Sequence, residues 1–268
     1  MTDTVLLVGC GNMGRAMLEG WLTARPTLRA HVVEPAPELR ARASALGAAA
    51  VAARSDLPEG LRPDLIFLAV KPQVIASVLP DYAGFAGAVF ASVAAGVTVA
   101  TLRAGLGGKA PVIRCMPNTP AAIGAGMMVC YATPEVDAGA KALTDALLSA
   151  SGEVAWIDDE GLMDAVTAVS GSGPAYVFHL IETMAAAGVA AGLPADLSER
   201  LAKQTVMGAG RLAAESGVEP GRLREQVTSP NGTTAAALEV LMGPGGLKPL
   251  MERAVAAAKA RGEELGRA

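Results

Sequence analysis

The segment TVLLVGCGNMG, residues 4–14, joins an apolar run to a glycine-rich loop. Thr4–Val8 has the composition of a strand and Asn12–Ala24 that of a helix, so the loop connects the two. In such a loop Gly9 permits a tight turn, Gly11 lets a pyrophosphate approach the backbone, and Gly14 lets the helix pack closely. The free N–H groups at the helix N-terminus favour phosphate oxygens. The motif therefore predicts a dinucleotide site formed by Gly9, Cys10, Gly11, Asn12, Met13 and Gly14.

Strands and helices continue to alternate beyond this loop. Further strands are expected at His31–Glu34, Asp64–Val70, Val89–Val93 and Pro111–Cys115, and the helices between them include Pro37–Leu46 and Pro72–Leu79. This alternation predicts a parallel sheet with right-handed crossovers. Residues 1–157 are therefore expected to form a doubly wound α/β domain of the Rossmann type.

The pattern changes after Trp156. Apolar residues then recur at helical spacing, without β-rich alternation. Helices are expected at Asp164–Ala168, Tyr176–Gly192, Ser198–Ser216, Gly221–Val227, Thr233–Met242 and Leu247–Leu265. Residues 158–268 are therefore expected to form an all-helical second domain.

Glu34 closes the second expected strand, about twenty residues after Gly14. An acid at that place accepts hydrogen bonds from ribose hydroxyls and repels a 2′-phosphate, which favours NAD. Arg40 and Arg42 follow closely, and they either reach a 2′-phosphate or lie on a solvated helix face. The residues alone therefore leave both NADPH and NADH open as the cofactor.

Two more loops follow strands, at the edge where doubly wound folds bind ligands. Lys71, between Val70 and Pro72, is a lone cation after a buried strand, and we expect a cofactor contact there rather than an ordinary surface lysine. Asn118 lies in a loop stiffened by two prolines, Met116–Pro120. It either binds a nicotinamide amide, since its side chain both donates and accepts, or belongs to a merely rigid turn.

One loop of the second half has the character of a ligand site. Val227–Ala235 (VTSPNGTTA) places proline, glycine and two threonines directly before a helix. A plain helix cap needs only one hydroxyl residue. We therefore expect this helix N-terminus to bind a small carboxylate.

The composition excludes several classes of protein. Of the 268 residues 51% are hydrophobic and 18% charged, which rules out disorder, and a net charge of −4 without a basic run argues against nucleic acid as a partner. The uncharged stretch Tyr82–Leu102 is rich in glycine and alanine, so turns, a short strand and a helix start are expected there rather than a membrane span. The start Met1-Thr2-Asp3 is not typical of a signal peptide.

The reactive side chains are few. Cys10, Cys115 and Cys130 match no disulfide or zinc pattern and are expected to be buried thiols in a reducing cytosol, which predicts a cytoplasmic protein without a metal. The two histidines lie far apart, and no Ser-His-Asp, Cys-His or paired-carboxylate arrangement can be assembled. A dinucleotide can carry the difficult step itself, and this scarcity is compatible with hydride transfer to an imine.

Two motifs of the second half carry a family resemblance. DAVTAVSGSGPAY (164–176) and QVTSPNGTT (226–234) resemble the pyrroline-5-carboxylate reductases, as do the Gly9–Gly14 loop, Ala69–Gln73 and Met116–Pro120, so that the likeness covers nearly the whole chain. It implies reduction of Δ1-pyrroline-5-carboxylate to L-proline by NADPH or NADH, the last step of proline biosynthesis. It also implies a homodimer formed through the helical domain and, in some members, a decamer.

The resemblance further implies roles for individual residues. Beyond the glycine loop it places the cofactor on Asp56, Val70, Lys71, Ala95 and Gln226, and the substrate on Glu160, Ser229, Gly232, Thr233 and Thr234. Thr234 would be the catalytic residue, hydrogen-bonded to the ring nitrogen while hydride reaches the C=N carbon. The N–H groups around Gly232–Thr234 would hold the carboxylate.

Two residues depart from the family pattern. Asn231 stands where the family usually has glycine, and because asparagine tolerates positive φ the turn is expected to survive. Glu34 is an acid where members that prefer NADPH would not carry one.

Two other classes compete with this interpretation. A β-hydroxyacid dehydrogenase or imine reductase shares the layout, with Lys203 as the nearest candidate for a catalytic lysine, although its surroundings do not match and the Ser229–Thr234 loop fits imine reduction better. A non-catalytic nucleotide sensor would bind the cofactor without turnover.

Overall fold

The computed structural model describes residues 3–85 and 87–267. The expectation that the chain starts without a signal peptide rests partly on Met1 and Thr2. These two residues lie outside the described residues. The chain divides into two compact units, Met1–Gly171 with Lys259–Ala268 and Ser172–Ala258. The expected boundary between residues 157 and 158 falls inside the first of these units.

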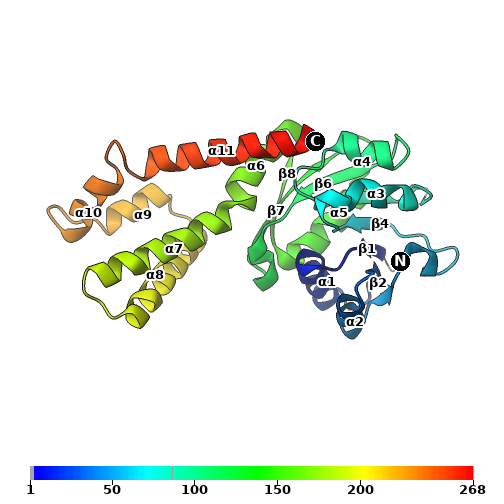
Figure 1. Cartoon of the computed structure of the whole chain (residues 1–268), viewed down its shortest axis with the longest axis horizontal. Coiled ribbons are helices and arrows are strands. Elements are labelled where there is room, and N and C mark those ends of the chain that lie inside the picture. The colour runs from blue at the N-terminus through cyan, green and yellow to red at the C-terminus, as the bar shows by residue number, and fades with distance from the viewer. Residues whose placement is uncertain (1–2, 86, 268) are drawn as a thin grey trace. The chain divides into compact units, whose positions relative to one another are not determined.

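The described residues of the first unit form an eight-stranded sheet (Figure 1). Its strands are β1 (Thr4–Val8), β2 (Arg29–Val33), β3 (Ala49–Val51), β4 (Leu65–Leu68), β5 (Val89–Ser92), β6 (Val112–Met116), β7 (Gly126–Ala132) and β8 (Gly152–Ile157). Their order is β3-β2-β1-β4-β5-β6-β7-β8, and β7 runs antiparallel to β6 while the other neighbours are parallel. The chain order reverses between β1 and β4, which creates the crevice that binds ligands in such sheets.

Helices cover both faces of this sheet. They are α1 (Asn12–Ala24), α2 (Pro37–Ala45), α3 (Pro72–Tyr82), α4 (Val99–Gly105), α5 (Ala138–Leu148) and the short α6 (Met163–Val166). Single turns occur at η1 (Arg54–Asp56), η2 (Thr119–Ile123), η3 (Ser149–Ser151) and η4 (Glu160–Leu162), and a π-helical turn, η5, spans Thr167–Gly171.

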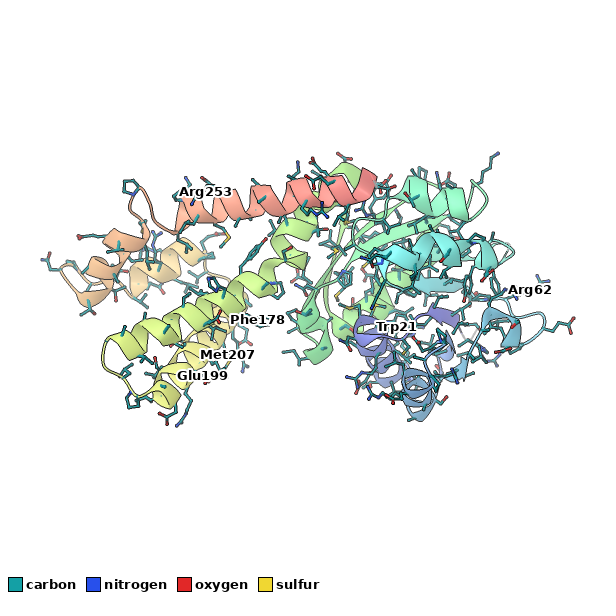
Figure 2. All side chains as sticks on the ribbon, viewed as in Figure 1. Trp21, Arg62, Phe178, Glu199, Met207 and Arg253 are labelled. Carbon is teal, nitrogen blue, oxygen red and sulfur yellow. The ribbon has the colours of Figure 1, made fainter. Side chains whose placement is uncertain are left out.

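The core forms because successive strand residues face opposite sides of the sheet. Val5 and Leu7 of β1 lie in one apolar cluster with α1 and α5, whereas Leu6 and Val8 lie in the other with α3 and α4. In the first cluster Trp21, labelled in Figure 2, packs on the Phe67 ring with centroids 4.6 Å apart. Two buried faces explain why the strands are almost entirely apolar.

The described residues of the second unit are helical. Its helices are α7 (Gly173–Ala190), α8 (Ala195–Glu215), α9 (Pro220–Gln226), α10 (Thr233–Leu241) and the start of α11 (Leu247–Arg267), whose end belongs to the first unit. α7 and α8 lie side by side (Figure 1), and the Ser198 hydroxyl donates to the Ala185 carbonyl at 2.6 Å. A Cβ at Gly188 would lie 2.1 Å from the Ser198 oxygen, so a side chain there would displace this hydroxyl from its hydrogen bond.

A doubly wound α/β fold followed by a helical region is confirmed. The strands β3, β7 and β8 and the helix α5 were not expected, and β7 departs from the parallel pattern. Residues 117–125 explain the reversal, because so short a connection cannot contain the crossover that a parallel neighbour needs. The stretch Tyr82–Leu102 contains β5 and the start of α4, as expected. No helix in the described part of the chain has the length and apolar character to span a membrane.

Candidate active site

The glycine loop lies at the carboxyl end of β1, beside the loop that follows β4. Gly9 has φ +88°, and a Cβ built there would lie 2.9 Å from the Ala69 carbonyl oxygen. At Gly14 a Cβ would lie 2.4 Å from the Gly9 carbonyl oxygen, so neither position has room for a side chain. At Gly11 no described atom lies within 4 Å of such a Cβ. The loop is therefore closely packed on the inside and open at Gly11, which fits a dinucleotide pyrophosphate.

Glu34 lies directly after β2 and turns its side chain toward this loop. The residue is only 6% exposed. Its Oε2 accepts the Cys10 N–H at 2.7 Å and its Oε1 accepts the Ala36 N–H at 2.9 Å. Burial, followed by the nearby Glu34 charge, raises the pKa of the Cys10 thiol to about 11. Cys10 therefore stays a neutral thiol in the loop at neutral pH.

The loop after β4 forms the adjoining part of the same edge. A Cβ at Gly9 would lie 3.0 Å from Val70 Cγ1, so the two loops are in contact. Lys71 is exposed and precedes α3, whose first residue is Pro72. The exposed ammonium group of Lys71, next to the glycine loop, can form a favourable electrostatic contact with a phosphate.

Two further predicted cofactor residues follow other parallel strands. Ala95 is half-buried in the loop after β5. Asp56 ends the turn after β3, is exposed, and accepts the Ala53 N–H through Oδ2 at 3.1 Å. Both positions follow the carboxyl ends of parallel strands, the side on which such sheets bind ligands, and their contact with a cofactor stays a prediction.

Asn118 connects two segments of the first unit. Its Nδ2 donates to the carbonyl and hydroxyl oxygens of Ser170 at 3.2 and 3.4 Å. Its Oδ1 accepts the Met127 N–H at 2.9 Å. Both ends of the amide are thus used inside the chain, and Asn118 fastens the β6–β7 loop to the π-helical turn. Contact with a nicotinamide stays a prediction.

A buried arginine holds Glu160, one of the predicted substrate residues. Arg114 on β6 is 5% exposed, and its Nη1 donates to Glu160 Oε1 at 2.9 Å. Its Nη2 lies 3.6 Å from Asp164 Oδ1, and the Val99 N–H donates to the same Glu160 oxygen at 2.8 Å. The sequence interpretation gave Arg114 no role, although a charged residue inside an apolar strand was a visible signal.

Replacing Arg114 by methionine is expected to lower the free energy of unfolding by about 3 kcal/mol, because two largely buried carboxylates would lose their cation. Urea unfolding measures this change. The control is Arg211→Met, which removes an ion pair to Glu215 with both side chains exposed and is expected to cost within about 0.5 kcal/mol. Equal effects of the two changes would contradict the structural role given to Arg114.

The predicted substrate loop belongs to the second unit. Asn231 has φ +58°, which confirms the expected turn, and the Gly232 N–H donates to the Ser229 carbonyl at 3.0 Å. Thr233 and Thr234 then begin α10, with Thr234 half-buried and Thr233 exposed. The first N–H groups of a helix have no acceptor within it, so this turn can bind a carboxylate.

The remaining predicted or rival residues have simpler surroundings. Gln226 is exposed at the end of α9. Lys203 forms an exposed ion pair with Glu199 on α8. Cys10, Cys115 and Cys130 are free and buried, as expected. Among the described residues no three His, Cys, Asp or Glu side chains are grouped as metal ligands.

Two family models match the chain. One is described as pyrroline-5-carboxylate reductase dimerisation and matches residues 160–265. The other is described as NADP oxidoreductase coenzyme F420-dependent and matches residues 4–96.

Known proteins resemble the chain over its whole length. A pyrroline-5-carboxylate reductase of Pseudomonas aeruginosa is 40% identical over 267 residues, which cover 98% of this chain and 97% of that protein. The structure of a pyrroline-5-carboxylate reductase from Coxiella burnetii has a TM-score of 0.91 at 33% identity and covers 99% of both chains. That of Plasmodium falciparum pyrroline carboxylate reductase with NADP bound has a TM-score of 0.83 at 27% identity over 98% of both.

The doubly wound sheet has a glycine loop, residues 9–14, where the strand order reverses, and a helical region follows it. Together with the NADP oxidoreductase model at residues 4–96, this places the chain among the dinucleotide-dependent oxidoreductases of the Rossmann type. The likeness to the Pseudomonas aeruginosa protein, together with the dimerisation model, narrows that class. The chain belongs to the pyrroline-5-carboxylate reductase family.

Proposed function

We propose that this chain reduces Δ1-pyrroline-5-carboxylate to L-proline with NADPH or NADH, the last step of proline biosynthesis. The observation that carries the proposal is the glycine cradle at the carboxyl end of β1, in a chain similar throughout its length to reductases of that name. The scarcity of acid–base residues supports it, because a bound dinucleotide would supply the hydride.

The chain's own residues would hold the cofactor at the carboxyl edge of the sheet. Open space at Gly11 supports a backbone contact with the pyrophosphate, and the exposed Lys71 supports a charge contact. Glu34 and Asn118 would act largely by holding loops, since their polar atoms are already hydrogen-bonded. The proposed cofactor residues are Gly9, Cys10, Gly11, Asn12, Met13, Gly14, Glu34, Asp56, Val70, Lys71, Pro72, Ala95, Asn118 and Gln226.

The substrate would be held by the loop before α10 and by Glu160. The free N–H groups of this helix N-terminus would bind the carboxylate, while the Thr234 hydroxyl hydrogen-bonds the ring nitrogen. Orientation of the C=N bond would supply most of the acceleration. Glu160 uses Oε1 for both of its described bonds, which leaves Oε2 for the substrate. The proposed substrate residues are Glu160, Ser229, Gly232, Thr233 and Thr234.

The proposal is tested by the loss of absorbance at 340 nm when the substrate is added to enzyme with NADPH or with NADH. Substrate-dependent oxidation of either cofactor is the expected result. Cofactor binding without any oxidation would favour a nucleotide sensor, and oxidation only with hydroxyacid or other imine substrates would favour the rival enzyme classes.

We propose a homodimer formed through residues 158–268, with assembly of dimers into a decamer as a larger form. The dimerisation model matched at residues 160–265 supports this domain boundary. α7 supports the dimer, because none of its residues is buried although most are apolar. Large apolar side chains are exposed on α7 and on the adjacent α8, as expected of a surface that a second chain covers: Val177, Phe178, Leu180, Met184, Val189, Leu197, Leu201, Met207 and Leu212.

Changing Phe178 to glutamate is expected to convert the assembly to monomers, because the carboxylate would be buried without a partner. Phe178, labelled in Figure 2, is 62% exposed. Sedimentation velocity measures the change. The matched control is Ile123→Glu in the first unit, where the side chain is 83% exposed and the assembly should persist. A wild-type monomer, or an unaltered assembly of the Phe178 variant, would contradict this interface.

We also propose a cytoplasmic location, without nucleic acid or membrane as a partner. Three free cysteines, all buried, support a reducing compartment. The net charge of −4 supports a small-molecule substrate rather than nucleic acid.

A further inference from the structure

The segment after β2 contains Glu34, in the turn, and Arg40, on the first part of α2, with different surroundings. We infer that Arg40 sets the choice of cofactor, that Glu34 does not, and that the chain therefore prefers the dinucleotide with a 2′-phosphate, NADPH. The inference rests on the proposed function and gives its cofactor site a specificity that the residue at Glu34 would not suggest.

Glu34 is not placed to receive ribose hydroxyls. An acid selects NAD at this position by accepting hydrogen bonds from the ribose, which requires a carboxylate that faces the cofactor. Here the residue is buried, and each carboxylate oxygen already accepts a main-chain N–H, from Cys10 and from Ala36. Glu34 therefore connects the glycine loop to the start of α2, and its role is to fix the shape of the loop.

Arg40 is fixed at the same turn by its guanidinium. Its Nη1 donates to the carbonyl oxygens of Glu34 at 2.9 Å and of Pro35 at 3.0 Å. The group has five N–H donors. No hydrogen bond joins Nη2 or Nε to another described residue, so these atoms remain for a ligand. A guanidinium already held in place loses little freedom when it binds a phosphate, which it matches in shape and charge.

The position of the Arg40 guanidinium determines which part of a bound dinucleotide it contacts. In doubly wound folds the adenine ribose lies beside the end of the second strand, and an arginine there accommodates a 2′-phosphate. Glu34 and Pro35, whose carbonyls hold Arg40, are the first residues after β2. Arg42 is on the same helix but is exposed and has no bond to the turn among the described residues. Arg42 therefore serves as the matched control.

Equilibrium titrations of the full chain without substrate test the inference, with the fluorescence of NADPH or NADH as the readout. The wild type is expected to bind NADPH at least tenfold more tightly than NADH. Arg40→Gln should bring the two dissociation constants within threefold by weakening NADPH alone, and Arg40→Lys should retain part of the preference. Arg42→Gln should leave the ratio unchanged. Glu34→Gln should weaken both cofactors by similar factors, since it disturbs the loop.

A second titration needs no variant and so does not depend on how the variants fold. Each competitor is titrated against NADPH bound to the wild type. The competition constant of adenosine 2′,5′-bisphosphate should be at least tenfold lower than that of adenosine 5′-monophosphate. Equal competition, equal binding of NADPH and NADH, an unchanged ratio in Arg40→Gln, or a ratio raised by Glu34→Gln would each overturn the inference while the proposed function stands. Binding of neither dinucleotide would overturn both.

Discussion

Replacing Gly14 by alanine is expected to weaken NADPH binding about a hundredfold, a loss of about 3 kcal/mol of binding free energy, because the loop would have to leave the shape that holds the pyrophosphate. The reason is steric. A Cβ at Gly14 would lie 2.4 Å from the Gly9 carbonyl oxygen and 3.4 Å from the Ala69 Cβ, and main chain cannot move aside as a flexible side chain can. The thermal midpoint should fall in the same variant, because the clash exists without any ligand.

Gly11 separates the effect on binding from the effect on folding. A methyl group at Gly11 would meet no described atom within 4 Å, and the residue has φ −66°, which any residue tolerates. Gly11→Ala should therefore melt like the wild type and still bind NADPH at least about tenfold more weakly, since the methyl group would occupy the space of the pyrophosphate. Gly84→Ala, also free of contacts, is the neutral control. Wild-type affinity of Gly11→Ala for NADPH would contradict the proposal that the pyrophosphate binds at the glycine loop.

Replacing Thr234 by valine is expected to lower kcat/KM for pyrroline-5-carboxylate about a hundredfold, the usual effect of removing one oriented hydrogen-bond donor. Valine keeps the shape of threonine and removes only the hydroxyl. The dissociation constant for NADPH should stay at the wild-type value, because the proposed role of Thr234 is toward the substrate. Thr234→Ser, which keeps the hydroxyl, should recover most of the rate. A wild-type kcat/KM in the valine variant would refute the assignment.

Much of the fold could be predicted because local pattern and tertiary structure agree in it. β1, β4 and β5 are apolar runs, β2 and β6 are mostly apolar, and helical composition marks most of the segments between them. β3 (AAV) could not be predicted, because three residues with two alanines have little strand preference and form a strand only through pairing with β2. The antiparallel direction of β7 could have been predicted, because the connection between β6 and β7 is too short for a parallel pair.

The site was predictable in its residues but not in its hydrogen bonds. The glycine motif predicts a cradle, and the contacts at Gly9 and Gly14 agree with it. Sequence position suggested that Glu34 would face the ribose, yet the carboxylate is turned inward, a direction that no spacing rule reveals. The same limit applies to Asn118, whose amide binds Ser170 from a segment far along the chain.

The proposed reaction forms L-proline from pyrroline-5-carboxylate and oxidises one reduced dinucleotide for each molecule of L-proline. The most direct test is to quantify both NADPH consumed and L-proline formed in one reaction with purified enzyme. Equal amounts of the two are expected, with no consumption of NADPH when the substrate is omitted. A protein that binds NADPH but forms no L-proline from this substrate would contradict it.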